Sequence, residues 1–260
     1  MENGQMDRFW EVDFLRGIAI VLMVLFHLAY DLNYFGVYEV ELASGFWFYL
    51  ARFTASLFLL LVGVSLTLSH SRAVIVGRED RFRIHLLKRS LWILGLAMGV
   101  TLATYLFIGE GFIVFGVLHL IGISLLLAYP FLRLHGVNFI FGLLFILLGL
   151  YLQNLSVDFP WLLWLGLAPR EFSSVDYLPL LPWFGVILMG VAFGDFFYRD
   201  YRRRIRLPDL AGAPLVKRLA FLGRNSLAVY LAHQPVLIGL MYLGGVSLPW
   251  NSISIDLERL

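Results

Sequence analysis

Hydrophobic residues occur along this chain in seven long runs, separated by short stretches that contain charged or turn-forming residues. Most runs approach the roughly 20 apolar residues that a helix needs to cross the hydrocarbon core of a bilayer. The pattern therefore predicts an all-α fold, a polytopic transmembrane helical bundle of about seven spans. The predicted spans are approximately 13–31, 46–69, 88–108, 112–132, 137–154, 178–198 and 219–243.

Composition supports this prediction. Hydrophobic residues make up 60% of the 260 positions and charged residues only 15%, and the mean hydropathy is +0.81. Soluble domains have about 25% charged residues. The chain contains no cysteine, which excludes disulfides, thiolate metal sites and a cysteine nucleophile. No small-residue cleavage site follows the first run, so we expect a retained signal-anchor helix.

Lysine and arginine are concentrated in alternate gaps between the predicted spans. The gaps that follow the second, fourth and sixth spans are basic, whereas the other gaps contain only Arg170. By the positive-inside rule, the basic gaps are cytoplasmic, the N-terminus is inside and the C-terminus is outside. We expect a multi-pass protein of the cell membrane, with Arg202, Arg203 and Arg204 near anionic lipid headgroups.

Ionisable residues within predicted spans are candidates for function. His27 and Asp31 are four residues apart and share a helical face, so Asp31 could hold one ring nitrogen of His27 and leave the other to act as a base. The alternative is a solvated aspartate beside a structural histidine. Arg16 lies eleven residues before His27, about three turns or 16 Å away on the same side. It is either a snorkelling flank or a ligand for a cytoplasmic anion.

Three further residues have two interpretations each. Arg52 either pairs with Asp31 or binds an anionic or carbonyl group of a ligand. His119, which lies between two glycines, is either a core histidine or a ligand contact. His233 precedes Pro235, and a proline frees backbone carbonyls within a span. His233 either hydrogen-bonds to one of these freed carbonyls or contacts substrate.

The sequence predicts neither a metal site nor haem. Haem is disfavoured because no span carries two well-separated histidines, and His27 with Asp31 lacks the further ligands that zinc requires. A Walker loop and a Rossmann fingerprint are both absent from the sequence, and we expect no nucleic-acid partner. A phosphate-bearing cofactor would therefore depend on basic residues at the inner ends of spans, namely Lys88, Arg89 and Arg224.

Several segments resemble membrane acyltransferases. Residues 8–20, running on to His27, resemble their first span, and Arg16 with His27 matches the Arg-x10-His motif of the acyltransferase-3 superfamily. Residues 82–89 and 222–233 are similar to a basic entry to the third span and to a late-span motif. The shorter architecture, with 115–119 and 176–185, resembles the heparan-alpha-glucosaminide N-acetyltransferase catalytic-domain family in its prokaryotic form. The resemblance covers residues 8–243.

This resemblance implies a single transmembrane acyltransferase domain over 1–260, which moves an acetyl group from cytoplasmic acetyl-CoA to an amino or hydroxyl group of a sugar or glycan at the outer face. The family's eukaryotic branch has its active histidine in the loop after the first span. Residues 32–45 contain no histidine here, so we assign catalysis to His27. Membrane lipid is a further expected partner, and a homodimer is an open possibility.

The resemblance also implies roles for individual residues. His27 deprotonates the acceptor, and Asp31 orients the ring of His27. The cofactor-binding residues are Arg16, Lys88, Arg89 and Arg224, and the substrate-binding residues are Arg52, His119, Asp176, Trp183 and His233.

Two other classes of protein fit the same pattern. A small-solute transporter or flippase would also carry intramembrane His, Arg and Asp, but such proteins have internal repeats, and the sequence shows none. A structural subunit without turnover is the third interpretation.

Overall fold

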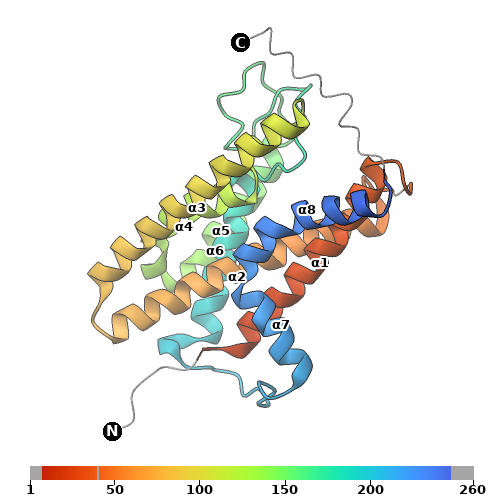
Figure 1. Ribbon diagram of the computed structural model, residues 1–260. Coiled ribbons are helices and arrows are strands. Elements are labelled where there is room, and N and C mark those ends of the chain that lie inside the picture. Colours follow the sequence, from red (N-terminus) through yellow and green to blue (C-terminus); the bar gives the residue numbers. More distant parts are fainter. Residues whose placement is uncertain (1–7, 40, 247–260) are drawn as a thin grey trace. The chain divides into compact units, whose positions relative to one another are not determined.

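The computed structural model describes residues 8–39 and 41–246, in which helices are joined by turns and loops and the only β-type pairing is an isolated bridge between Ser156 and Ala168 (Figure 1). The predicted all-α fold is confirmed for this part of the chain. The α-helices are α1 (Trp10–Tyr34), α2 (Gly45–Ile75), α3 (Glu79–Ile108), α4 (Val117–Leu127), α5 (Asn138–Leu152), α6 (Leu180–Phe197), α7 (Pro214–Arg224) and α8 (Ser226–Leu243). Short 3-10 helices are η1 (Pro130–Arg133), η2 (His135–Val137) and η3 (Arg199–Tyr201).

The chain divides into two compact units. Unit 1 is formed by the described parts of Met1–Phe58 and Pro208–Leu260, and unit 2 is Leu59–Leu207. Unit 1 therefore contains α1, the first part of α2, α7 and α8, whereas unit 2 contains the rest of α2 and α3 to α6. The candidate residues fall into two groups, Arg16, His27, Asp31, Arg52, Arg224 and His233 in unit 1, and Lys88, Arg89, His119, Asp176 and Trp183 in unit 2.

Six helices in the described residues are long and apolar enough to cross a membrane. They are α1, α2, α3, α6, α8 and the segment His135–Leu152, which contains α5. The structure is thus that of a multi-pass membrane protein, although the predicted count of about seven is not confirmed.

The difference in count arises in two predicted spans. The only α-helix in the predicted span 112–132 is α4, whose 11 residues extend about 16 Å, roughly half of the hydrocarbon core. The predicted span 219–243 is interrupted at Asn225, between α7 and α8. The side-chain amide of Asn225 donates to the carbonyl of Phe221 at 2.9 Å. Such a side-chain bond competes with the helical ladder, which accounts for the break.

The short helix α4 nevertheless belongs to a segment that runs back along α3. Near the end of α3, the Thr101 hydroxyl donates to the Ile113 carbonyl at 2.7 Å, and at its start Arg133 pairs with Glu79 at 3.0 Å. The 22 residues from Glu79 to Thr101 correspond to about 33 Å of helix. The segment 113–133 therefore covers a distance comparable with the thickness of a bilayer core.

Charged residues extend α3 beyond the predicted span, which begins at residue 88. The helix begins at Glu79, with acidic residues in its first turn. A polar segment can be helical although it is too polar to lie in a membrane core. Arg83 donates to Asp80 at 2.8 Å in this turn, a spacing that supports helices. The predicted gap 70–87 is consequently mostly helical.

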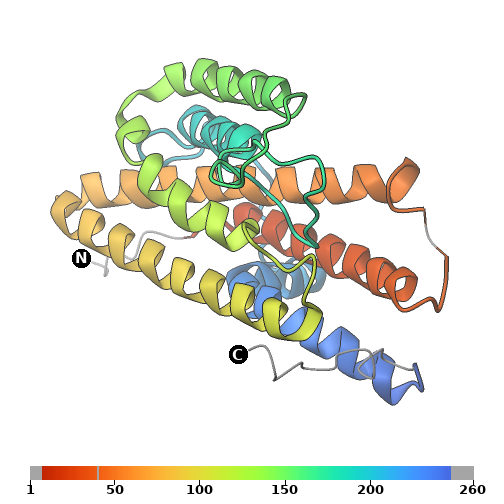
Figure 2. The ribbon, with the colours of Figure 1, turned by 90° about the horizontal axis from the view of Figure 1, so that it is seen from above.

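Small residues bring α2 and α6 together in unit 2. A Cβ atom added to Gly63 would overlap the backbone of Ile187, and one added to Gly190 would overlap Leu60. The Thr67 hydroxyl donates to the Val191 carbonyl at 3.2 Å beside this contact. Close backbone approach through small residues is typical of packed membrane helices. In Figure 2, α5 and α6 lie side by side in the same unit.

Candidate functional site

Two glycines bring α7 against the first half of α1 in unit 1 (Figure 1). Gly17 lies against the backbone of Leu219, and Gly223 lies against the carbonyl of Asp13, so a Cβ atom at either position would overlap the other helix. Substitution of either glycine would therefore push the two helices apart.

The predicted cofactor ligand Arg16 lies at this contact. Its Nη1 atom is 3.2 Å from Asp13 Oδ1 and 3.4 Å from the Gly223 carbonyl oxygen. Asp13 is only 4% exposed and also pairs with Arg8 at 3.5 Å. Because the guanidinium of Arg16 is held between α1 and α7, the geometry indicates that it positions α7 against the first half of α1.

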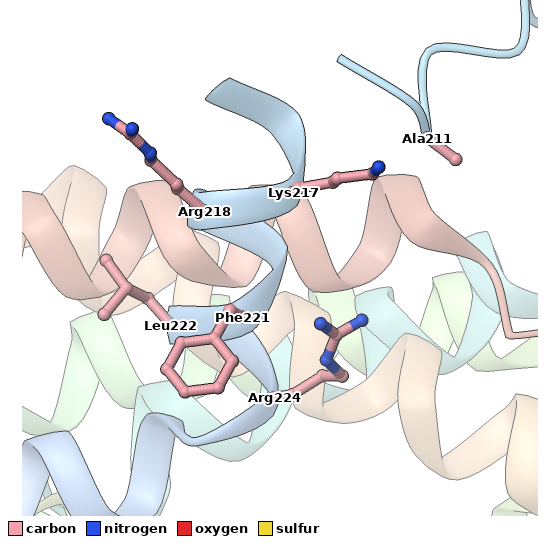
Figure 3. A pocket seen from close by; sticks show the side chains of 6 residues that line it. All are labelled: Ala211, Lys217, Arg218, Phe221, Leu222 and Arg224. Atoms are coloured by element: carbon pink, nitrogen blue, oxygen red, sulfur yellow. The ribbon is translucent and has the colours of Figure 1, made fainter. Parts of the chain in front are cut away.

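Arg224 lines a wide-open surface pocket of about 690 Å³ on α7, together with Lys217 and Arg218, neither of which is a candidate from the sequence (Figure 3). Lys217 and Arg224 are seven residues apart and extend from the same side of the helix. Ala211, Phe221 and Leu222 complete the lining. The opposite face of α7 is buried. In the sequence, Lys217 and Arg218 belong to a basic gap that indicates topology, although the seven-residue spacing from Lys217 to Arg224 is already visible there.

His27 lies in the second half of α1, and its orientation is set by its own helix. Its Nδ1 atom is 2.8 Å from the carbonyl oxygen of Met23. Because a carbonyl only accepts hydrogen bonds, Nδ1 carries the proton and Nε2 of the neutral ring has a free lone pair. The half-buried imidazole is therefore held in the tautomer that a general base requires.

His233 in α8 packs against His27. The two ring centroids are 4.7 Å apart with an interplanar angle of 77°. The Nδ1 atom of His233 is hydrogen-bonded to the Tyr230 carbonyl, which places the free lone pair of this ring on Nε2 as well. That Nε2 atom is buried and has no hydrogen-bond partner among the described residues.

Asp31 is 3% exposed, and its partner differs from the predicted one. Its Oδ1 atom accepts a hydrogen bond from Gln234 Nε2 at 3.2 Å, and no hydrogen bond joins it to His27 in the described part of the chain. The carbonyl of Met23 holds His27 in its tautomer instead. Sequence reasoning missed Gln234, whose only signal was its place between His233 and Pro235.

The predicted substrate ligand Arg52 is exposed. Its guanidinium lies over the ring of Phe48, 4.5 Å from the centroid. This contact joins residues one turn apart on α2. The alternative ion pair with Asp31 is absent from the ion pairs of the described residues.

His119 in unit 2 uses both ring nitrogens within the protein. Gly116 N–H donates to Nδ1 at 3.3 Å, so Nε2 carries the proton and donates to the Thr101 hydroxyl at 3.4 Å. That hydroxyl in turn donates to the Ile113 carbonyl. The chain of bonds fastens the loop before α4 to α3. The geometry thus favours the core interpretation of His119 over contact with substrate.

Asp176, another predicted substrate ligand, caps the N-terminus of α4. Its Oδ2 atom accepts from Val117 N–H at 3.1 Å, and a Cβ atom at Gly116 would overlap this carboxylate. A carboxylate at a helix N-terminus is favourable. The neighbouring Tyr177 hydroxyl donates to the Leu163 carbonyl at 2.8 Å, and burial raises the pKa of Tyr177 to about 12.

The remaining candidates make fewer informative contacts. Trp183 is half-buried in the first turn of α6, and Lys88 and Arg89 are exposed on α3. Their predicted roles stay predictions. No group of three or more His, Asp or Glu side chains is arranged to hold a metal ion within residues 8–39 and 41–246.

Comparison with known proteins identifies one family. The model of the family described as "Heparan-alpha-glucosaminide N-acetyltransferase, catalytic" matches residues 8–235. No curated protein and no solved structure shows a significant match to the chain. The matched segment includes α1, α7 and the first part of α8, and hence both histidines of unit 1.

Proposed function

Because the chain belongs to the heparan-alpha-glucosaminide N-acetyltransferase catalytic-domain family, and thus to the transmembrane acetyltransferases, we propose that it transfers an acetyl group from cytoplasmic acetyl-CoA to an amino or hydroxyl group of a sugar at the outer face of the cell membrane. The observation that carries this proposal is the arrangement along α1. A basic cavity lies at one end of unit 1, and a histidine with a free Nε2 lies about three turns further along.

The orientation that this requires is N-terminus inside, with seven crossings if the segment 113–133 is counted with the six long helices. The asymmetry of Lys and Arg supports it. Single cysteines introduced at positions 78, 203 and 161 of this cysteine-free chain test it. A membrane-impermeant maleimide should label only position 161 in intact cells. Labelling at 78 or 203 would refute the orientation.

The cavity on α7 has the chemistry to hold the phosphates of CoA. Lys217, Arg218 and Arg224 provide three cationic side chains, and Phe221 provides an aromatic face on which a purine can stack. When bound, acetyl-CoA supplies an activated thioester. Arg16 contributes by holding α7 in place through Gly223, and its cation lies at the same helix crossing.

His27 would act on the acceptor. Its Nε2 lone pair takes the proton from the N–H or O–H group as that group attacks the acetyl carbonyl, because Nδ1–H is already fixed to Met23. The new C–N or C–O bond replaces the thioester C–S bond, and CoA leaves as a thiolate that then takes up a proton. A positioned base of this kind typically contributes 10²–10⁴-fold to the rate.

The test is thermal unfolding of the purified protein with CoA. At 100 times its dissociation constant, CoA should stabilise the protein by about 2.7 kcal/mol, and the effect should weaken as salt rises. Arg224→Ala and Lys217→Ala should weaken CoA binding, whereas Arg170→Ala, outside α7, is the matched control. Stabilisation by anionic lipid but not by CoA would identify the cavity as a headgroup site and refute the proposal. Transport of solute without CoA would favour the transporter interpretation.

A further inference from the structure

Three hydrogen-bond acceptors near His27 lack donors. They are Asp31 Oδ2, Gln234 Oε1 and His233 Nε2, all buried and without a hydrogen-bond partner in the described residues. Asp31 and His233 are more than nine-tenths buried, at 3% and 8% exposed. The three residues, which we call the acceptor-atom cluster, come from α1 and α8 in unit 1.

When Asp31 is ionised, the three atoms cannot satisfy one another. A carboxylate oxygen and an amide oxygen carry no hydrogen, and His233 Nε2 has none because the proton of this ring is on Nδ1, bonded to the Tyr230 carbonyl. Buried acceptors without donors are unfavourable and uncommon in native proteins. A cluster of them therefore indicates a bound group that supplies N–H or O–H donors.

The cluster is held in place by its own contacts. Gln234 donates to Asp31 through Nε2, so its Oε1 atom is turned away from that bond. The ring of His233 packs on the ring of His27. His27 and Gln234 are half-buried, so both side chains keep some exposed surface. The base at His27 and the cluster thus lie side by side.

From this arrangement we propose that Asp31, His233 and Gln234 determine which molecule receives the acetyl group. They do so by binding a second hydrogen-bond donor group of that molecule, next to its reacting group. The reacting N–H or O–H faces His27 Nε2, and a neighbouring hydroxyl or amine donates to the cluster. The acceptor class is then a vicinal amino alcohol or diol, and a molecule with a single amine or hydroxyl binds poorly. This inference rests on the proposed function for the reaction, but the binding it describes needs no acetyl-CoA.

A matched pair of small molecules tests the inference. Cyclohexylamine and trans-2-aminocyclohexanol differ by one adjacent hydroxyl, and their binding is measured by thermal stabilisation of the purified protein without acetyl-CoA. We expect the amino alcohol to bind roughly tenfold more tightly, the effect of one hydrogen bond to a buried group. Gln234→Met should abolish the preference. Gln153→Met, at an exposed glutamine after α5, should preserve it.

Asp31→Asn is the second variant, because it keeps the size of the side chain and replaces one acceptor oxygen by a donor. It too should lose the preference. Equal binding of the two molecules to the wild-type protein, or a preference that survives both substitutions, would mean that only water fills the cluster and would overturn the inference. CoA binding is measured on the same samples. If CoA binds but the preference is absent, the inference fails alone, and if the preference is present without CoA binding, the acetyltransferase proposal fails alone.

Discussion

His27 and His119 are both histidines in apolar helices, yet their surroundings leave different atoms free. His119 is bonded through both ring nitrogens, to Gly116 N–H and to the Thr101 hydroxyl. His27 is bonded through Nδ1 to the Met23 carbonyl of the same helix, and it lies beside three buried hydrogen-bond acceptors that lack donors. Adding a proton to the ring of His119 would break a bond that holds α4, whereas the ring of His27 is held with a lone pair available.

The contrast shows that burial in a span does not identify a catalytic histidine. What distinguishes the two is the inventory of donors and acceptors around each ring. A histidine whose hydrogen bonds are complete stabilises the fold, and one with an incomplete set is available for a ligand. The predictions below test this division, beginning with the largest expected effect.

His27→Ala should lower acetyl transfer by at least about a hundredfold, because the acceptor loses its base. CoA binding should be unchanged, since Lys217 and Arg224 are untouched. The measurement is acceptor-dependent CoA release from acetyl-CoA, with His85→Ala on the exposed surface of α3 as the control. Normal turnover by His27→Ala would place the base elsewhere.

His119→Ala should do the reverse of His27→Ala, because it should lower stability and leave the rate of acetyl transfer nearly unchanged. It leaves Gly116 N–H without its partner, and such a loss destabilises a protein by about 1–3 kcal/mol. Thermal unfolding measures this loss, and the rate of transfer per folded molecule should stay close to that of the wild type. Thr101→Val, which breaks the same chain of bonds, should also be less stable. An inactive but fully stable His119→Ala variant would reverse the division between the two histidines.

Asp31→Asn should reduce transfer by about tenfold, less than His27→Ala, because Asp31 holds the acceptor and does not itself take the proton. The effect should appear mainly in KM for the acceptor. A loss as large as that of His27→Ala, entirely in kcat, would instead give Asp31 a direct part in the proton transfer.

Tyr177→Phe should have the smallest effect. It changes the pH dependence of folding stability, and this change is visible only at high pH. Tyr177 has a folded pKa of about 12 and an ordinary unfolded pKa of about 10. Between these values the unfolded chain binds fewer protons than the folded one, so the stability due to Tyr177 is present below pH 10 and is lost as pH approaches 12. The stability difference between wild type and Tyr177→Phe should be constant below pH 9 and then shift in favour of the variant. A difference that is independent of pH would contradict the assignment.

The apolar runs of the sequence determined most of the helices. Five predicted spans, those of α1, α2, α3, α5 and α6, correspond to helices in the structure, because burial of an apolar segment in a bilayer requires only length and composition. The spacing between Arg16 and His27 likewise follows from the geometry of one helix. Family membership was also visible in the order of the motifs.

Only the tertiary structure decided which polar atoms meet. Asp31 bonds Gln234, which lies 203 residues away, and Asp176 caps α4 across 59 residues. Neither partner can be read from local spacing, since each depends on how distant helices and loops pack. The break at Asn225 was missed for a related reason, because apolar content does not reveal a side chain that competes for the backbone. Sequence thus specified the helices through local chemistry, and the packing of distant helices and loops gave Asp31 and Asp176 their partners.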